Sequence, residues 1–189
     1  PGKPLSGGQQ GGIPMEEMGA YVQDILDLIE YANGDPKTNK WAKMRAEAGH
    51  PKPFNLKYIG IGNEDLITPI FEERFEMIFK AIKGKYPEIT VIGTVGPFYE
   101  GSDYEAGWKF ASRLQVPMVD EHYYNTPGWF INNQDFYDRY DRSKPKVYLG
   151  EYAAHLPGRP NNIETALAEA LYLTSVERNG DVVSMTSYA

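Results

Sequence analysis

Two glutamates each follow a short apolar segment that is typical of a buried strand. Glu64 ends YIGIGNE (58–64), and Glu151 ends KVYLGE (146–151). A carboxylate is costly to bury at the end of an apolar strand unless it is paired, hydrogen-bonded or used in catalysis. Retaining cleavage of a glycosidic bond requires two carboxylates, one as acid/base and one as nucleophile. The pair therefore predicts a catalytic site built from Glu64 and Glu151.

Polar residues near the two glutamates could hold a sugar. Asn63 precedes Glu64, and an amide there could bond the sugar 2-hydroxyl, a contact that strengthens in the transition state. The alternative for Asn63 and Glu64 is a turn that caps the next helix. In DEHYYN (120–125), strand alternation places Asp120, His122 and Tyr124 on one face. We expect His122 to be a neutral donor to the sugar or to Glu64. Tyr124 or Tyr152 is expected to donate to Glu151 and keep it ionised.

Trp129 follows the turn TPG (126–128) and could form a wall of a sugar subsite, or could be a packing anchor. The three histidines show neither HxH nor HExxH spacing, so the sequence predicts no metal site. It contains no Gly-x-Ser-x-Gly motif, which disfavours a serine hydrolase, and it predicts no cofactor.

Composition limits the class of protein. The 189 residues fit one domain, and the net charge of −7 argues against a nucleic-acid partner. No apolar run approaches the roughly 18 residues of a membrane-spanning helix, so no membrane partner is expected. Without cysteines the redox compartment cannot be read, and the localisation stays open.

Strand-like and helix-like segments alternate along the chain. The first helix is predicted from Pro14 to Asn33, and a polar, Lys-rich connection follows it through Lys52. Strands are then expected at 57–62, 89–94, 117–124, 146–151 and 181–188, and helices at 68–84, 104–114, 132–140 and 162–178.

The starts of successive strands are about 28 to 36 residues apart, which is typical of βα units with parallel strands. A doubly wound sheet would usually have a Gly-rich phosphate loop after an early strand, and none is present. A (β/α)8 barrel instead places its working residues at the C-terminal ends of the strands, where Glu64, His122, Tyr124 and Glu151 are expected. A complete barrel needs roughly 200 to 250 residues. The predicted fold is therefore α/β, a partial (β/α)8 TIM barrel of about five βα units.

Three motifs together resemble the α-L-arabinofuranosidases of glycoside hydrolase family 51: YIGIGNE (58–64), DEHYYN (120–125) and YLGEYA (148–153). The opening helix YVQDILDLIEYANG (21–34) is also similar to theirs. The resemblance implies a retaining mechanism with Glu64 as acid/base and Glu151 as nucleophile. It also implies that Asn63, His122 and Tyr124 contact the sugar.

Members of that family carry three earlier barrel strands, which supply an arginine and another acidic residue, and a β-sandwich domain. The sequence predicts neither in 1–189, which is read as a single incomplete catalytic domain of a longer parent. Exposed edges at the missing strands would favour a homo-oligomer. A periplasmic or extracellular bacterial location would suit the parent.

The resemblance implies release of terminal α-L-arabinofuranosyl groups from arabinose-containing plant polysaccharides. Two alternatives stay open: another retaining glycosidase of the same clan, such as a β-xylosidase or endoglucanase, and a non-catalytic glycan-binding fragment.

Overall fold

The computed structural model describes residues 12–158 and 160–189. They form two compact units: an amino-terminal unit (12–61 and 68–91) and a carboxyl-terminal unit (62–67, 92–158 and 160–189). The five strands are hydrogen-bonded in chain order, β1-β2-β3-β4-β5, and helices lie between them in the sequence. The predicted βα alternation is confirmed. Over the described ranges, no helix is both long enough and apolar enough to cross a membrane.

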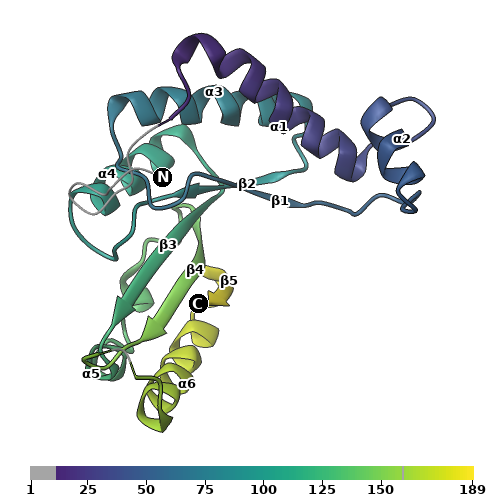
Figure 1. Cartoon of the computed structure of the whole chain (residues 1–189). Helices are drawn as coiled ribbons and strands as arrows, with labels where there is room; N and C mark the ends of the chain where they lie inside the picture. The colour runs from purple at the N-terminus through teal and green to yellow at the C-terminus, as the bar shows by residue number, and fades with distance from the viewer. Residues whose placement is uncertain (1–11, 159) are drawn as a thin grey trace. The chain divides into compact units, whose positions relative to one another are not determined.

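The amino-terminal unit contains η1 (Met15–Glu17), α1 (Met18–Asn33), α2 (Lys40–Glu47), β1 (Tyr58–Ile61) and α3 (Pro69–Lys85), and β2 (Thr90–Thr94) begins in it. Within this unit α1 packs on α3 (Figure 1). The helix expected from Pro14 is confirmed, with a 3₁₀ first turn. Thr68 caps α3 as its sequence predicts, because the Thr68 hydroxyl accepts from the Phe71 N–H at 3.2 Å.

The polar connection expected after α1 contains a helix, α2, so that part of the sequence prediction is wrong. The Asn39 side chain caps α2 by accepting from the backbone N–H groups of Trp41 and Ala42 at 2.8 and 3.2 Å. Arg45 of α2 is fully buried. Its guanidinium donates to the carbonyls of Tyr31, Ala32, Gly34, His50 and Pro51. These tertiary bonds hold α2 against the end of α1, and no local apolar pattern signals them.

The carboxyl-terminal unit holds the rest of the sheet. Its elements after β2 are α4 (Ser102–Leu114), β3 (Met118–Asn125), α5 (Pro127–Asn132), η2 (Tyr137–Arg139), β4 (Lys146–Ala154), α6 (Ile163–Arg178) and β5 (Val183–Tyr188). The β2–β3, β3–β4 and β4–β5 pairs are parallel, and α6 packs on β4 (Figure 1). Strand β4 continues to Ala154, so Glu151 lies inside the strand and not at the end that its sequence predicts.

A β-bulge in β4 interrupts its pairing with β3. Leu149 pairs with Glu121 and Glu151 pairs with His122, so Gly150 is an extra residue without a partner in β3. A bulge reverses the facing of every side chain after it. Leu149, before the bulge, is fully buried on the helix-covered face of the sheet. Glu151, after it, shares the opposite face with His122.

The helix expected at 132–140 is a second error. The structure starts α5 earlier, because Thr126 accepts from the Trp129 N–H at 3.3 Å and Pro127 occupies the first helical position. The helix ends at Asn132, and the Asn132 side chain itself donates to the Gly128 carbonyl at 2.8 Å. Asn133 and Gln134 donate in the same way to Trp129 and Phe130. Side chains thus satisfy the last carbonyls of α5 and end it.

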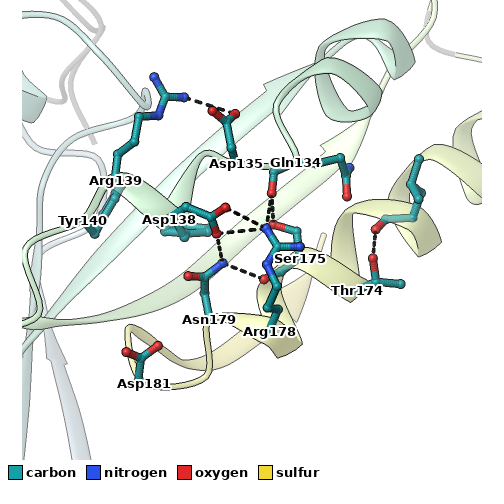
Figure 2. A network of polar contacts seen from close by, with 12 residues as sticks. Gln134, Asp135, Asp138, Arg139, Tyr140, Thr174, Ser175, Arg178, Asn179 and Asp181 are labelled. Carbon is teal, nitrogen blue, oxygen red and sulfur yellow. Dashed lines mark hydrogen bonds and ion pairs between the residues drawn. The ribbon is translucent and has the colours of Figure 1, made fainter.

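A network of polar contacts joins the segment around η2 to the end of α6 (Figure 2). Asp138 accepts from the Arg178 guanidinium at 2.9 and 3.0 Å and from the Asn179 amide at 2.7 Å. These bonds, the Asn179 contact first, lower the pKa of Asp138. Ser175 and Arg178 both donate to the Gln134 carbonyl, at 2.6 and 2.8 Å. The loop between α5 and β4 therefore has a fixed conformation although it contains only one turn of 3₁₀ helix.

Glu121 is fully buried on the helix-covered face of β3, inside a layer of aromatic side chains. Its carboxylate accepts from the Trp108 indole N–H at 3.0 Å, the Tyr140 hydroxyl at 2.7 Å and the Tyr137 hydroxyl at 2.9 Å. Tyr137 also bonds Tyr123, at 3.0 Å between the hydroxyl oxygens. Burial raises the pKa of Glu121, and the hydrogen bonds from the tyrosines and Trp108 oppose that rise. The charged group is tolerated in the core because it has donors on both oxygens.

We expect Glu121→Ala to destabilise the chain by about 3 kcal/mol, since one buried donor, Tyr137, and two part-buried donors, Trp108 and Tyr140, lose an acceptor at about 1–3 kcal/mol each. Urea unfolding followed by circular dichroism measures the loss. Glu105→Ala, at an exposed position on α4, is the matched control and should change stability by no more than about 0.5 kcal/mol. Equal stability of the two variants would show that the network around Glu121 contributes nothing.

Candidate active site

The backbone around Glu64 is held in an unusual conformation. Glu64 has a φ of 54°, in the left-handed region that non-glycine residues seldom adopt, and Gly62 has a φ of 83°. The Glu64 N–H donates to the Thr94 hydroxyl at 3.1 Å, and the Asn63 N–H donates to the Asp65 carboxylate at 2.7 Å. Burial raises the pKa of Asp65, and the bond from Asn63 opposes this. Strain held by such specific contacts is typical of functional sites.

His122 lies between three carboxylates. Its Nδ1 is 3.0 Å from Glu64 Oε1 and 3.7 Å from Glu151 Oε2, and its Nε2 is 3.0 Å from Asp120 Oδ2. The His122 side chain is only 3% exposed, whereas those of Glu64 and Glu151 are 27% and 35% exposed. The imidazole ring is therefore buried beneath the two partly exposed carboxylates.

The expectation of a neutral His122 is wrong. Burial lowers the pKa of His122, but the hydrogen bond and charge of Asp120, the hydrogen bond to Glu64 and the charge of Glu151 outweigh burial and raise it to about 9. The ring is thus an imidazolium at neutral pH, with an N–H on both nitrogens. The expected bond between His122 and Glu64 is present.

Tyr124 supplies the predicted donor to Glu151. Its hydroxyl donates to Glu151 Oε2 at 2.7 Å, and its ring stacks on His155 with centroids 5.2 Å apart. Tyr152, the other candidate, is buried against Tyr188, on the face of β4 away from His122. The phenol donates a hydrogen bond to Glu151, and the imidazolium adds an ion pair at 3.7 Å; together they orient the Glu151 carboxylate.

The two glutamates are close together. One ligand atom each from Glu64, His122 and Glu151 lies within 4.8 Å of the others. One oxygen of Glu64 and one of Glu151 are thus no more than 4.8 Å apart, which fits the roughly 5–5.5 Å between the carboxyl groups of retaining glycosidases and not the roughly 6.5–9.5 Å of inverting ones. The same trio offers one ligand atom each to a cation. The absence of a metal site stays a prediction.

Asn63 and Trp129 are the other two residues predicted to bind the sugar. Asn63 is exposed and adjacent to Glu64 in the same turn, so its predicted sugar contact stays a prediction. Trp129 is half-buried in the aromatic layer, with ring centroids 4.8 Å from Tyr99 and 5.3 Å from Tyr123. Because Tyr123 faces away from His122, these contacts are those expected of Trp129 as a packing anchor. The predicted subsite wall at Trp129 is not tested by them.

Asp120 and Thr94 are the site residues that sequence reasoning missed. The alternation of β3 already placed Asp120 on the face of His122, which was a usable signal. Thr94 ends β2 and accepts from the backbone of a residue 30 positions away, and no local pattern announces such a bond.

Parallel strands alternating with helices, with polar side chains gathered near the C-terminal ends of the strands, define a segment of a (β/α)8 barrel of the glycoside-hydrolase class. The family model for the alpha-L-arabinofuranosidase 1 domain matches residues 5–142, and that for the alpha-L-arabinofuranosidase C-terminal domain matches residues 132–189. The chain belongs to the α-L-arabinofuranosidase family. The resemblance in its motifs is thus confirmed.

Individual relatives support the same family assignment. The chain is 49% identical over 169 residues to an extracellular exo-alpha-L-arabinofuranosidase of Streptomyces chartreusis, covering 89% of this chain and 20% of that protein. It is 34% identical to alpha-L-arabinofuranosidase 2 of Arabidopsis thaliana, covering 89% of this chain and 24% of the relative. The chain thus spans about a fifth to a quarter of the length of these relatives.

Solved structures extend the agreement to the fold. An arabinose-bound GH51 α-L-arabinofuranosidase matches 97% of this chain and 30% of its own, with a TM-score of 0.74 and 28% identity. A family 51 α-L-arabinofuranosidase from Bifidobacterium longum matches with a TM-score of 0.73 at 14% identity, which supports the fold alone. The predicted partial (β/α)8 barrel is confirmed.

Proposed function

We propose that this chain carries the acid/base and the nucleophile of a retaining α-L-arabinofuranosidase that acts on arabinose-containing plant polysaccharides. The observation that carries the proposal is that one oxygen of Glu64, one oxygen of Glu151 and one ring nitrogen of His122 lie within 4.8 Å of one another. A carboxylate at that separation can reach the anomeric carbon directly, without an intervening water.

In the proposed reaction, Glu151 attacks the anomeric carbon and Glu64 protonates the leaving oxygen. Glu64 then takes a proton from the water that hydrolyses the glycosyl-enzyme. Tyr124 holds the Glu151 oxygen that does not attack. Asn63, adjacent to Glu64, bonds the sugar 2-hydroxyl, and Trp129 is the remaining candidate for sugar binding. An extracellular site of action is proposed by analogy with the Streptomyces relative.

Association of copies also stays a proposal. Ile163, Leu167 and Leu171 are 73%, 62% and 44% exposed and lie one turn apart on α6. An apolar stripe of this kind on a helix favours contact with another surface.

Aryl glycosides that differ only in their sugar test the proposed function. We expect this chain to release nitrophenol from the α-L-arabinofuranoside and to leave the β-D-xylopyranoside and β-D-glucopyranoside unchanged. Turnover of the xyloside alone would identify a different retaining glycosidase of the clan. Binding of arabinose in a nuclear magnetic resonance titration without any turnover would contradict the catalytic proposal and identify a glycan-binding chain.

A further inference from the structure

The Asp120 side chain has one hydrogen-bond partner among the described residues. Asp120 Oδ2 accepts from His122 Nε2 at 3.0 Å. Its other oxygen, Oδ1, is buried and accepts no hydrogen bond from any described residue. A carboxylate with a single partner is stabilised almost entirely by the charge of that partner. Asp120 and His122 are therefore strongly coupled.

The bulge at Gly150 explains why Oδ1 has no partner. A Cβ built on Gly150 would lie 1.9 Å from Asp120 Oδ1 and 2.9 Å from Asp120 Cγ. The carboxylate is thus pressed against the backbone of the bulge, where a water or side chain has no room. This packing prevents rotation of Asp120 away from His122.

The opposite edge of the His122 ring faces the two glutamates. The charged groups around the ring are Asp120 on β3, Glu64 on the turn after β1 and Glu151 on β4. With Nε2–H donated to Asp120, the second proton on Nδ1 is donated to Glu64 at 3.0 Å, and its charge also pairs with Glu151 at 3.7 Å. Without that proton, two carboxylate oxygens within 4.8 Å would repel each other with no cation between them.

We propose that Asp120 is a positioning residue that holds His122 in the doubly protonated form, so that Nδ1–H keeps Glu64 and Glu151 at the separation of a retaining site. The proposal rests on the function proposed above for the two glutamates. Asp120 touches neither the substrate nor the reacting atoms, and it acts through the charge of His122.

Asp120→Asn tests the coupling without a large change of shape. The asparagine oxygen can still accept from Nε2–H, but the negative charge is lost. The pKa of His122, about 9 in the native chain, should fall toward its usual value near 6.5. Nuclear magnetic resonance titration of the histidine ring signals measures this shift, and the signals of His50 and His155 serve as internal references.

Asp103→Asn is the matched control. Asp103 is buried, accepts from the Ile67 N–H at 3.1 Å and has an unpaired second oxygen like Asp120, but it does not contact His122. Its substitution should leave the His122 titration unchanged. An unchanged titration in a folded Asp120→Asn variant would overturn the proposal. If that variant does not fold, an ordinary titration of His122 in the native chain would overturn it equally.

Kinetics supply the second readout. In Asp120→Asn the alkaline limb of kcat should move to lower pH by the same amount as the His122 titration, with KM nearly unchanged below pH 6. The two readouts are separable. A chain that lacks glycosidase activity contradicts the proposed function, while the resonance titration still tests the coupling of Asp120 to His122.

The sign of the stability effect follows from the raised pKa of His122. Since the folded state binds this proton more tightly than the unfolded chain, the contribution is fully present below pH about 6.5 and is lost as the pH rises through about 9. In Asp120→Asn this alkaline loss should be smaller and should end at lower pH, because only the pKa of the folded state falls.

Discussion

Glu151→Ala is expected to abolish the glycosyl-enzyme and to lower kcat by at least ~10⁴-fold, the scale seen when a covalent nucleophile is removed. The physical reason is that the proposed reaction forms the glycosyl-enzyme through the Glu151 carboxylate, which alanine removes. Intact-mass spectrometry after rapid quenching with an activated aryl α-L-arabinofuranoside detects the intermediate as one added pentosyl group.

Glu64→Ala should behave differently, because an acid/base is dispensable for a good leaving group. We expect a loss of about 10²–10⁴-fold in kcat for unactivated substrates. For activated aryl glycosides the first step should be spared and hydrolysis of the intermediate slowed. Added azide should then partly restore turnover, since a small anion needs no general base.

Glu88→Ala, at an exposed glutamate of the amino-terminal unit, is the control for these two variants and should retain full activity. Near-normal turnover in both Glu64→Ala and Glu151→Ala would show that the paired glutamates are not the catalytic residues. Azide rescue of Glu151→Ala rather than Glu64→Ala would reverse the two roles.

Gly150→Ala is expected to damage both stability and the site. The added Cβ would lie 1.9 Å from Asp120 Oδ1, far inside any real contact. Asp120 cannot yield without losing its bond to His122, and the bulge cannot yield without moving Glu151. We expect a loss of about 1–3 kcal/mol, typical of overpacking, in urea unfolding. The pKa of His122 should fall as well, because its bond to Asp120 is disrupted.

Gly84→Ala provides the opposite outcome with the same chemical change. Gly84 lies near the end of α3, is exposed, and has no atom within 4 Å of an added Cβ. Its substitution should stabilise the chain by up to about 1 kcal/mol, since alanine is the better helix former. If Gly150→Ala proved equally harmless, the close packing of the bulge on Asp120 would be wrong.

Local sequence patterns predicted most of the fold correctly. The strands and the helices α1, α3, α4 and α6 follow from apolar periodicity, and Thr68 caps α3 as expected. The errors lie where side chains that bond backbone carbonyls override the apolar pattern. Buried Arg45 stabilises α2 within a polar segment, and the side chains of Asn132 and Asn133 end α5 where further helix was expected.

Most residues of the candidate site were also readable from the sequence, because strand order brings the ends of β3 and β4 together with the turn after β1. Asp120 and Thr94 were not singled out. The protonation of the site residues was not readable. His122 was expected to be neutral, and only the tertiary structure surrounds it with Asp120, Glu64 and Glu151 and thereby raises its pKa to about 9.

The sequence by itself determined the parallel βα order and the family, and it predicted the pair Glu64 and Glu151. It did not determine which face of β4 carries Glu151. Strict alternation places Glu151 with Val147 and Leu149, which are fully buried on the helix-covered face. Only the pairing with β3 introduces the bulge at Gly150, where Asp120 leaves no room for a side chain. That one unpaired residue turns Glu151 toward His122, because a shift of one residue in a strand exchanges its two faces.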